Sequence, residues 1–446
     1  MTKMLEILKR LNEPALVRDF QRLCGVILKP TATGDGHGNS PGKVLKGSTD
    51  HSIHGKNGVI KAPGGTECEA QLKQRSAASE AKRSDKPKEV QNGMRRNISR
   101  DSLETDGPSG SEEEGNNGEY DIENKFLYAL FHFGANLGNE LFYILFFPWW
   151  FWNIDGYVGR RLCLFWALFM YLGQAAKDII KWPRPASPPV VRMEKRYALE
   201  YGMPSTHSMV GAGVPFGILF LTYGRYKYDF GICCFGATLW CCLVAFSRLY
   251  LGMHSILDVI AGLLFVFSLM PVVLPFMDAI DNAILTHPWS PALCLLIPLV
   301  MCLAYPTLDR WSTARGDTTL ILAVAAGISV GHWVSFQYGF MHKAPTSPPY
   351  DIIPPTWQWF GEMLMRLSIG VVILFSTRAV FKAMTLNATC WLAGVDRRDK
   401  AAHQNIRIEL PCKFITYAAI AFNTVYLAPQ VFRYLGIERE TFFTEI

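Results

Sequence analysis

Three short segments of the sequence concentrate the side chains that enzymes use to bind and transfer phosphate. They are residues 177–185, 204–207 and 247–258, in that order along the chain. Three cations directed at one point suit a phosphate dianion and the charge that spreads over its oxygens during transfer. The candidate site residues are Lys177, Arg184, Ser205, Thr206, His207, Arg248, His254 and Asp258.

Two of these residues, His254 and Asp258, are spaced to work as a pair. They lie four positions apart, so on a helix they would share one face. The carboxylate can accept a proton from one imidazole nitrogen and leave the other nitrogen as a nucleophile. This pattern predicts covalent catalysis with His254 as the attacking group.

The remaining candidates would complete a phosphate site. Arginine offers a fork for paired oxygens, whereas lysine acts as a point charge. Ser205 and nearby backbone amides can add hydrogen-bond donors. The leaving alkoxide of a phosphate monoester needs a proton, and His207 is a second titratable group that can give it.

Two other interpretations of such residues were weighed. An HxxxD pair with another histidine can bind zinc, but three nearby cations would repel a metal ion, so we expect no metal. Isolated cations at span ends, such as Lys181 and Arg192, usually reach to lipid headgroups. Isolated histidines are usually structural, and we assign that role to His287, His332 and His342.

Long apolar stretches must position the three segments. A helix needs about 20 apolar residues to cross a bilayer, and lipid forbids unpaired backbone groups. The sequence therefore predicts an all-α, polytopic transmembrane helical bundle of about nine spans. The candidate spans are 128–152, 161–180, 208–225, 229–247, 256–277, 291–308, 318–336, 359–381 and 412–434.

The order of the spans brings the segments together. The loops after the second and fourth spans lie on the same face of the membrane, because the third and fourth spans make one return crossing. All three segments can therefore meet at that face. The charge of +6 fits a protein beside anionic headgroups and is weak evidence for nucleic acid, so we expect a lipid partner and no nucleic acid.

The region before the spans has a different composition. Residues 27–124 are rich in glycine, serine and charged residues and cannot bury a core, so we predict a disordered tail. Residues 1–26 place leucines at roughly helical spacing, which predicts either an amphipathic docking helix or a frayed tail helix. Their charges also argue against a cleavable signal peptide. No oligomeric state can be inferred.

The order KxxxxxxRP, PSxH, SRxxxxxHxxxD resembles the signature of the type 2 phosphatidic acid phosphatase superfamily, which includes vanadium haloperoxidases. The resemblance implies a six-helix phosphatase core, here within residues 125–280, with further spans in 281–446. It implies that His254 forms a phosphohistidine, that Asp258 orients it, and that His207 protonates the leaving oxygen. It implies no metal or other cofactor. The phosphate ligands that it implies are Lys177, Arg184, Ser205 and Arg248.

One position departs from the commonest pattern of that superfamily, because Thr206 stands where glycine is usual. This variant, with residues 201–207 and 247–258, is similar to the sphingosine-1-phosphate phosphatases. That similarity implies a multi-pass enzyme of the endoplasmic reticulum. It would convert sphingosine, dihydrosphingosine and phytosphingosine 1-phosphates to free sphingoid bases, with its site facing the lumen.

Other functions fit the same residues. A broader lipid phosphate phosphatase, a polyprenyl diphosphate phosphatase or a glucose-6-phosphatase would use the same site, and a transporter or scaffold could keep the fold without catalysis. Orientation is also open. Basic loops at Arg160 and Arg225 favour a lumenal site, whereas the loop at Arg397 argues against it under nine spans.

Overall fold

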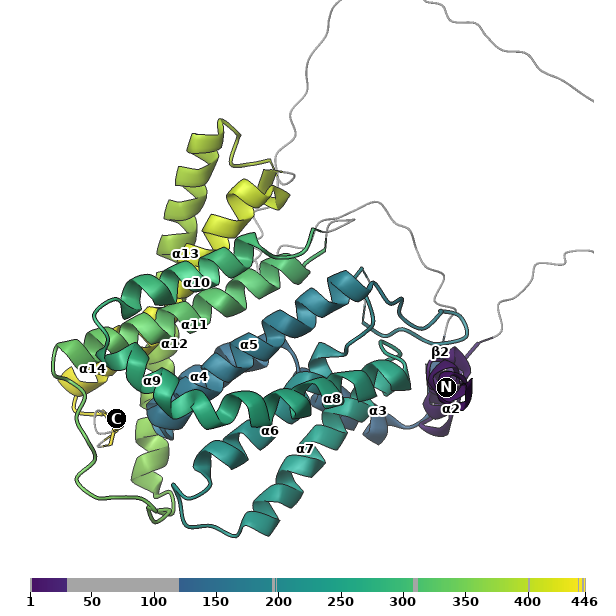
Figure 1. Ribbon diagram of the computed structural model, residues 1–446, viewed down its shortest axis with the longest axis horizontal. Helices are drawn as coiled ribbons and strands as arrows, with labels where there is room; N and C mark the ends of the chain where they lie inside the picture. The colour runs from purple at the N-terminus through teal and green to yellow at the C-terminus, as the bar shows by residue number, and fades with distance from the viewer. Residues whose placement is uncertain are drawn as a thin grey trace, which may run out of the picture. The chain divides into compact units, whose positions relative to one another are not determined.

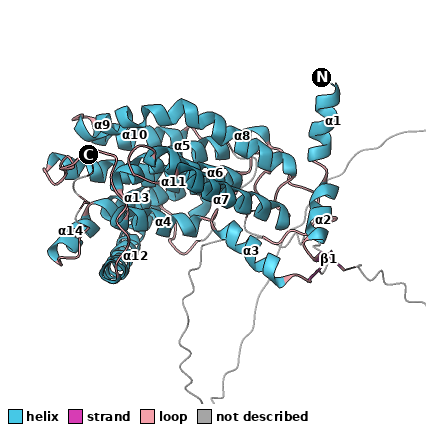
Figure 2. Ribbon diagram, turned by 90° about the horizontal axis from the view of Figure 1, so that it is seen from below, coloured by secondary structure: helices cyan, strands magenta, loops and turns pink. Residues whose placement is uncertain are grey.

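The computed structural model describes residues 2–29, 120–194, 197, 199–307, 312–399, 402–439, 441–442 and 445. Nearly all of the secondary structure in these residues is helical (Figure 2). Most of the predicted disordered tail, residues 30–119, lies outside the described residues.

Five helices in the described residues are long and apolar enough to cross a membrane. Two shorter apolar helices, α6 (Thr206–Thr222) and α10 (Ser290–Leu303), accompany them. The all-α membrane bundle is therefore confirmed, while the number of nine spans stays a prediction. The five are α5 (Gly156–Ile180), α7 (Phe230–Tyr250), α8 with its continuation through η1 and α9 (Ile256–Val273, Leu274–Phe276, Met277–Thr286), α11 (Ala314–Gln337) and α12 (Trp357–Ala393).

Helices α5 to α8 lie side by side, with α6 packed against the other three (Figure 1). Small residues allow α6 this close approach. A Cβ at Gly211 would lie 2.7 Å from Val244 of α7, and one at Gly213 would lie 2.6 Å from Phe169 of α5. Helices α5 and α7 end, and α6 and α8 begin, at one end of the bundle, which we call the site end.

The first predicted span, 128–152, is divided into α3 (Lys125–Asn136) and α4 (Glu140–Asn153). The chain turns between them where Gly138 is pressed against His207, since a Cβ there would lie 2.5 Å from the imidazole. The last predicted span, 412–434, is likewise divided into α13 (Ile406–Val425) and α14 (Leu427–Tyr434).

This division shortens the first crossing to α4 but leaves two crossings before the site, as the predicted spans give. Helix α3 stays at the site end, because Phe131 stacks on Tyr250 at the end of α7 with ring centroids 4.8 Å apart. Helix α4 then leads away from that end, since Asp155, just after it, pairs with Arg225 beyond the far end of α6. Among the described residues, α4 and α5 are thus the two helices that run between the two ends before the site.

The N-terminal segment forms two helices, α1 (Thr2–Leu11) and α2 (Pro14–Leu23), and the second is docked on the bundle. The buried Gln21 amide donates to the carbonyls of Val191 and Tyr250, at 2.7 and 2.8 Å, and accepts from the Val191 N–H at 3.0 Å. Helix α2 is thus tied both to the loop between α5 and α6 and to the end of α7.

Two short strands close the base of the tail. Strands β1 (Val26–Leu28) and β2 (Tyr120–Ile122) pair antiparallel, with Leu28 opposite Tyr120. Residues 27–28 and 120–122 therefore belong to the folded part of the chain, and assigning them to the tail was wrong. The pairing was missed because each strand has only three residues.

Candidate active site

The structure brings the three sequence segments together at the site end. Lys177 lies in the last turn of α5 and Arg248 in the last turn of α7, whereas Ser205 caps α6. None of the eight candidates is more than 9% exposed. Direct contacts join the segments: the Ser205 N–H donates to the Asp258 carbonyl at 3.0 Å, and Lys177 Nζ donates to Thr206 Oγ1 at 3.0 Å.

Helix capping fixes the carboxylate of Asp258. Ser255 is the N-cap of α8, its side chain accepts from the Asp258 N–H, and Asp258 Oδ2 accepts from the Ser255 N–H at 2.8 Å. This reciprocal capping box satisfies two otherwise unpaired donors at the start of the helix. It also holds the carboxylate facing His254, whose Nδ1 lies 3.8 Å from Asp258 Oδ2.

The contacts of His254 distinguish its two ring nitrogens. Arg184 Nη1 lies 3.3 Å from His254 Nε2, and because a guanidinium can only donate, Nε2 must be the acceptor. In the neutral ring Nδ1 then carries the proton and points to Asp258. The 3.8 Å separation is longer than a hydrogen bond, as is common before substrate tightens a catalytic site.

The surroundings of His254 keep its ring neutral. Burial, followed by the charges of Arg184, Arg248 and Lys177, lowers the pKa of His254 well below its usual value. Burial also lowers the pKa of Arg184 to about 10, so this guanidinium remains charged at neutral pH. A neutral imidazole beside fixed cations is suited to attack a phosphorus atom that those cations bind.

Two glutamates that the sequence analysis missed hold the cations. Glu200 Oε2 accepts from Lys177 Nζ at 3.1 Å, and Glu194 accepts from both terminal nitrogens of Arg248, at 3.3 and 2.7 Å. Burial acts to raise the pKa of Glu200, but Lys177 and Arg184 outweigh it and hold the pKa below its usual value. Both glutamates lie in the loop between α5 and α6, where no motif marked them.

His207 lies beside the break between α3 and α4. Its Nε2 is 3.0 Å from Asn139 Oδ1, and its ring meets the ring of Tyr197 edge to face at 5.5 Å. Asn139 was also missed. The only signal for it was the helix break itself, which the sequence analysis read as a continuous span.

Three of the candidates keep a buried polar atom without a hydrogen-bond partner. These atoms are Arg248 Nε, His254 Nδ1 and Asp258 Oδ1. A buried polar atom left in this way costs about 1–3 kcal/mol, so it usually marks a place for a ligand or water. All three belong to the residues that the sequence assigns to phosphate binding and transfer.

Comparison with known proteins supports the same conclusion. Residues 159–281 match the PAP2 superfamily. The rat sphingosine-1-phosphate phosphatase 1 is 38% identical over 96% of this chain and 97% of its own, and the human sphingosine-1-phosphate phosphatase 2 is 35% identical over 97% and 100%.

The chain belongs to the sphingosine-1-phosphate phosphatase family. The resemblance that the sequence segments predicted is therefore confirmed. A dihydrosphingosine 1-phosphate phosphatase of Schizosaccharomyces pombe is more distant, at 24% identity over 70% of this chain and 84% of its own. No solved structure matches the chain.

As a member of the sphingosine-1-phosphate phosphatase family, the chain uses Thr206 where the wider superfamily pattern has glycine. The Thr206 hydroxyl accepts from Lys177 Nζ, a bond that glycine cannot make. The sequence analysis identified only the replacement of the usual glycine by threonine. The structure adds a contact that orients Lys177, which the sequence predicts to bind phosphate.

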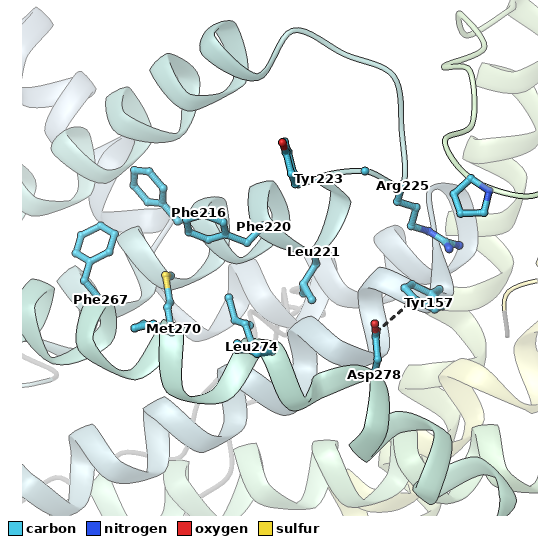
Figure 3. Close-up of a pocket in the computed structure, with 14 residues that line it drawn as sticks. Tyr157, Phe216, Phe220, Leu221, Tyr223, Arg225, Phe267, Met270, Leu274 and Asp278 are labelled. Atoms are coloured by element: carbon cyan, nitrogen blue, oxygen red, sulfur yellow. Dashed lines mark hydrogen bonds between the residues drawn. The ribbon is translucent and has the colours of Figure 1, made fainter.

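A cavity of about 680 Å³ lies away from this sphingosine-1-phosphate phosphatase site, near the opposite ends of α6 and α8 (Figure 3). Its apolar wall includes Phe216 and Phe267, and at one end Tyr157 donates to Asp278 at 2.9 Å. Phe216 is nine residues, or about 13 Å of helix, beyond His207. The cavity therefore does not hold the phosphate.

Proposed function

We propose that this enzyme hydrolyses sphingosine 1-phosphate and related sphingoid base 1-phosphates to free sphingoid bases through a phosphohistidine. The observation that carries the proposal is the placement of His254. Its unprotonated Nε2 faces the guanidinium of Arg184, while its Nδ1 faces Asp258. The relatives named for sphingosine 1-phosphate and dihydrosphingosine 1-phosphate support this class of substrate.

In the first chemical step, His254 Nε2 attacks phosphorus and the bond between phosphorus and the C1 oxygen of the lipid breaks. The leaving oxygen takes a proton from His207, and the free sphingoid base departs. Asp258 stabilises the positive charge that develops on the His254 ring. Lys177, Arg184, Ser205, Thr206 and Arg248 bind the phosphoryl oxygens.

In the second step, water attacks the phosphohistidine. His207, now neutral, takes a proton from that water, the nitrogen–phosphorus bond breaks, and inorganic phosphate leaves. In the substrate-free enzyme the Arg184 guanidinium donates to His254 Nε2. The bound phosphate must therefore draw the guanidinium away before Nε2 can attack. The charge of Arg184 favours this movement because a guanidinium is a stronger donor to a dianion than to a neutral ring.

The test uses purified protein in lipid with ³²P-labelled sphingosine 1-phosphate. We expect release of labelled phosphate, an acid-labile labelled protein in a rapid quench, and inhibition by vanadate. His254→Ala should lower turnover by a factor on the order of 10⁴ or more, while the exposed His342→Ala should match the parent. Equal turnover by His254→Ala and parent would eliminate the mechanism.

The substrate panel should also include phosphatidate, a polyprenyl diphosphate and glucose 6-phosphate. A clear preference for sphingoid base 1-phosphates supports the proposal. Equal rates across the lipids would indicate a broad lipid phosphatase, and no hydrolysis of any compound would indicate a transporter or scaffold.

The proposed location is the endoplasmic reticulum membrane, with the site facing the lumen. Two loops allow a test, because α12 separates residues 340–355 from residues 394–405. The first loop is at the far end, where Tyr350 accepts from the Lys227 N–H, and the second precedes α13, whose Glu409 pairs with Arg315 at the site end. A glycosylation sequon placed in the second loop should be modified and one in the first should not; the reverse result would place the site in the cytoplasm.

A further inference from the structure

The carboxylate of Glu194 is hydrogen-bonded to Arg248, one of the proposed phosphate ligands. Its two oxygens accept from Arg248 Nη1 and Nη2, at 3.3 and 2.7 Å. Paired acceptors are what an arginine fork binds, and a phosphate presents the same arrangement. In the substrate-free enzyme, Glu194 therefore takes up both terminal nitrogens of Arg248 and leaves Nε as the donor without a partner.

Glu194 is held less firmly than the other glutamate of the site. The Glu200 side chain is 5% exposed and has partners on both oxygens, Lys177 and Thr313. The Glu194 side chain is 20% exposed, and its described ion pair is with Arg248 alone. Arg248 itself is fixed, with a side chain that is 1% exposed. When the two separate, Glu194 is the partner that can move.

The net charge of the site indicates which charges a substrate should carry. Lys177, Arg184 and Arg248 balance Glu194, Glu200 and Asp258, and the proton that His207 needs for the first step adds one positive charge. A phosphate dianion would therefore leave one uncompensated negative charge in a buried site, which is costly. A substrate that carries its own cation close to the phosphate would balance it.

We propose that Glu194 selects substrates that carry an ammonium group next to the phosphate. Phosphate displaces Glu194 from Arg248, and the released carboxylate binds the ammonium on the carbon adjacent to the phosphorylated one. This inference rests on the proposed function, because sphingoid base 1-phosphates have this arrangement. A phosphate monoester without the ammonium would instead face an unpaired carboxylate, which disfavours it.

The test compares Glu194→Gln with the parent on two single-chain phosphate monoesters. Sphingosine 1-phosphate carries the ammonium, and lysophosphatidate lacks it. We expect the ratio of their kcat/KM values to fall on the order of 10–100-fold in the variant, the range for a hydrogen bond between charged groups. Loss of a merely structural ion pair would lower both values together and leave the ratio unchanged.

Glu362→Gln is a matched control. Glu362 also accepts from a buried arginine, with Oε2 2.7 Å from Arg366 Nη2, and its side chain is 29% exposed. It belongs to α12, away from the three sequence segments. In Glu362→Gln, the ratio of the two kcat/KM values and the turnover should both match those of the parent.

A comparison on the parent alone covers the case in which Glu194→Gln does not fold. N-acetylsphingosine 1-phosphate keeps the chain and phosphate but has no charge on nitrogen, so its kcat/KM should be at least tenfold lower. Equal values for the two compounds, or an unchanged ratio in folded Glu194→Gln, would overturn the inference and leave the proposed function standing. Failure of the parent to hydrolyse sphingosine 1-phosphate would instead overturn the proposed function.

Discussion

The bundle buries a group of charges at each end, and the two groups are paired differently. The far end holds a structural cluster, whose members are Asp155, Arg160, Arg161, Arg225 and Asp281. There, Asp281 accepts from Arg160 on both oxygens at 3.0 Å and also contacts Arg161 at 2.8 Å. At the site end, Asp258 Oδ1 and His254 Nδ1 have no hydrogen-bond partner.

We interpret this difference as one between charges that stabilise the fold and charges that the proposed mechanism uses on a ligand. Burial acts to raise the pKa of Asp155, but Arg225 and Tyr226 outweigh it and hold the pKa below its usual value, as in a completed ion pair. The unpartnered atoms at the site end instead cost stability until a ligand binds. Substitutions at the site end should therefore lower turnover, whereas substitutions at the far end should lower stability.

The largest effect on turnover among the following tests is expected for Asp258→Asn. The amide can still accept from the Ser255 N–H, so the helix cap survives, but it cannot stabilise a positive His254 ring. We expect kcat to fall on the order of 10³–10⁴-fold with little change in KM or thermal stability. A raised KM with unchanged kcat would assign Asp258 to substrate binding.

The next largest effect is expected at Thr206. Thr206→Val keeps the shape but removes the hydroxyl that accepts from Lys177, whereas Thr206→Ser keeps it. We expect Thr206→Val to lower kcat/KM about tenfold, the value of one hydrogen bond to a charged group. Thr206→Ser should stay within about twofold of the parent, and equal losses in both variants would point to packing instead.

The third prediction concerns the acid limb of the pH profile, that is, the fall of kcat/KM as the pH is lowered. Down to about pH 6, we expect kcat/KM of the parent enzyme to fall by only a few-fold. The lowered pKa of His254 means that the free enzyme keeps this ring neutral as the pH falls below 6.5. The limb should therefore follow the second ionisation of the substrate phosphate, near pH 6. A phosphorothioate substrate, which ionises at lower pH, should shift the limb downward; a limb that stays fixed would assign it to a group of the enzyme.

The smallest effect on turnover is expected for Asp281→Asn at the far end. Removing one partner of a buried ion pair costs about 3–5 kcal/mol, so thermal stability should fall clearly. Turnover per folded molecule should match the parent. A large loss of kcat in protein that remains folded would show that the two ends are coupled, and would contradict the separation drawn above.

The sequence predicted the meeting of the three segments because span order alone decides which loops share a face. It did not predict Glu194, Glu200 or Asn139. Their role depends on how a loop folds back over the site, and such folding leaves no periodic pattern. The sequence segments therefore identified the groups proposed to act on phosphate, but not the carboxylates that hold the cations in its absence.

Helix boundaries were predicted less well for a related reason. Hydropathy reports how apolar a stretch is but not where it turns, so 128–152 appeared as one span. The turn depends on the approach of Gly138 to His207, 69 positions later in the sequence. The docking of α2 through Gln21 depends equally on distant partners, Val191 and Tyr250.

The pairing of β1 with β2 gives the chain freedom in its length. Leu28 and Tyr120 face each other across an antiparallel ladder, so the stretch between them leaves and re-enters the enzyme at one place. Lengthening such a closed loop costs only about 0.6 kcal/mol per doubling. Insertions, deletions or even replacement by a short hairpin turn can therefore accumulate there over evolution while the catalytic machinery stays in register.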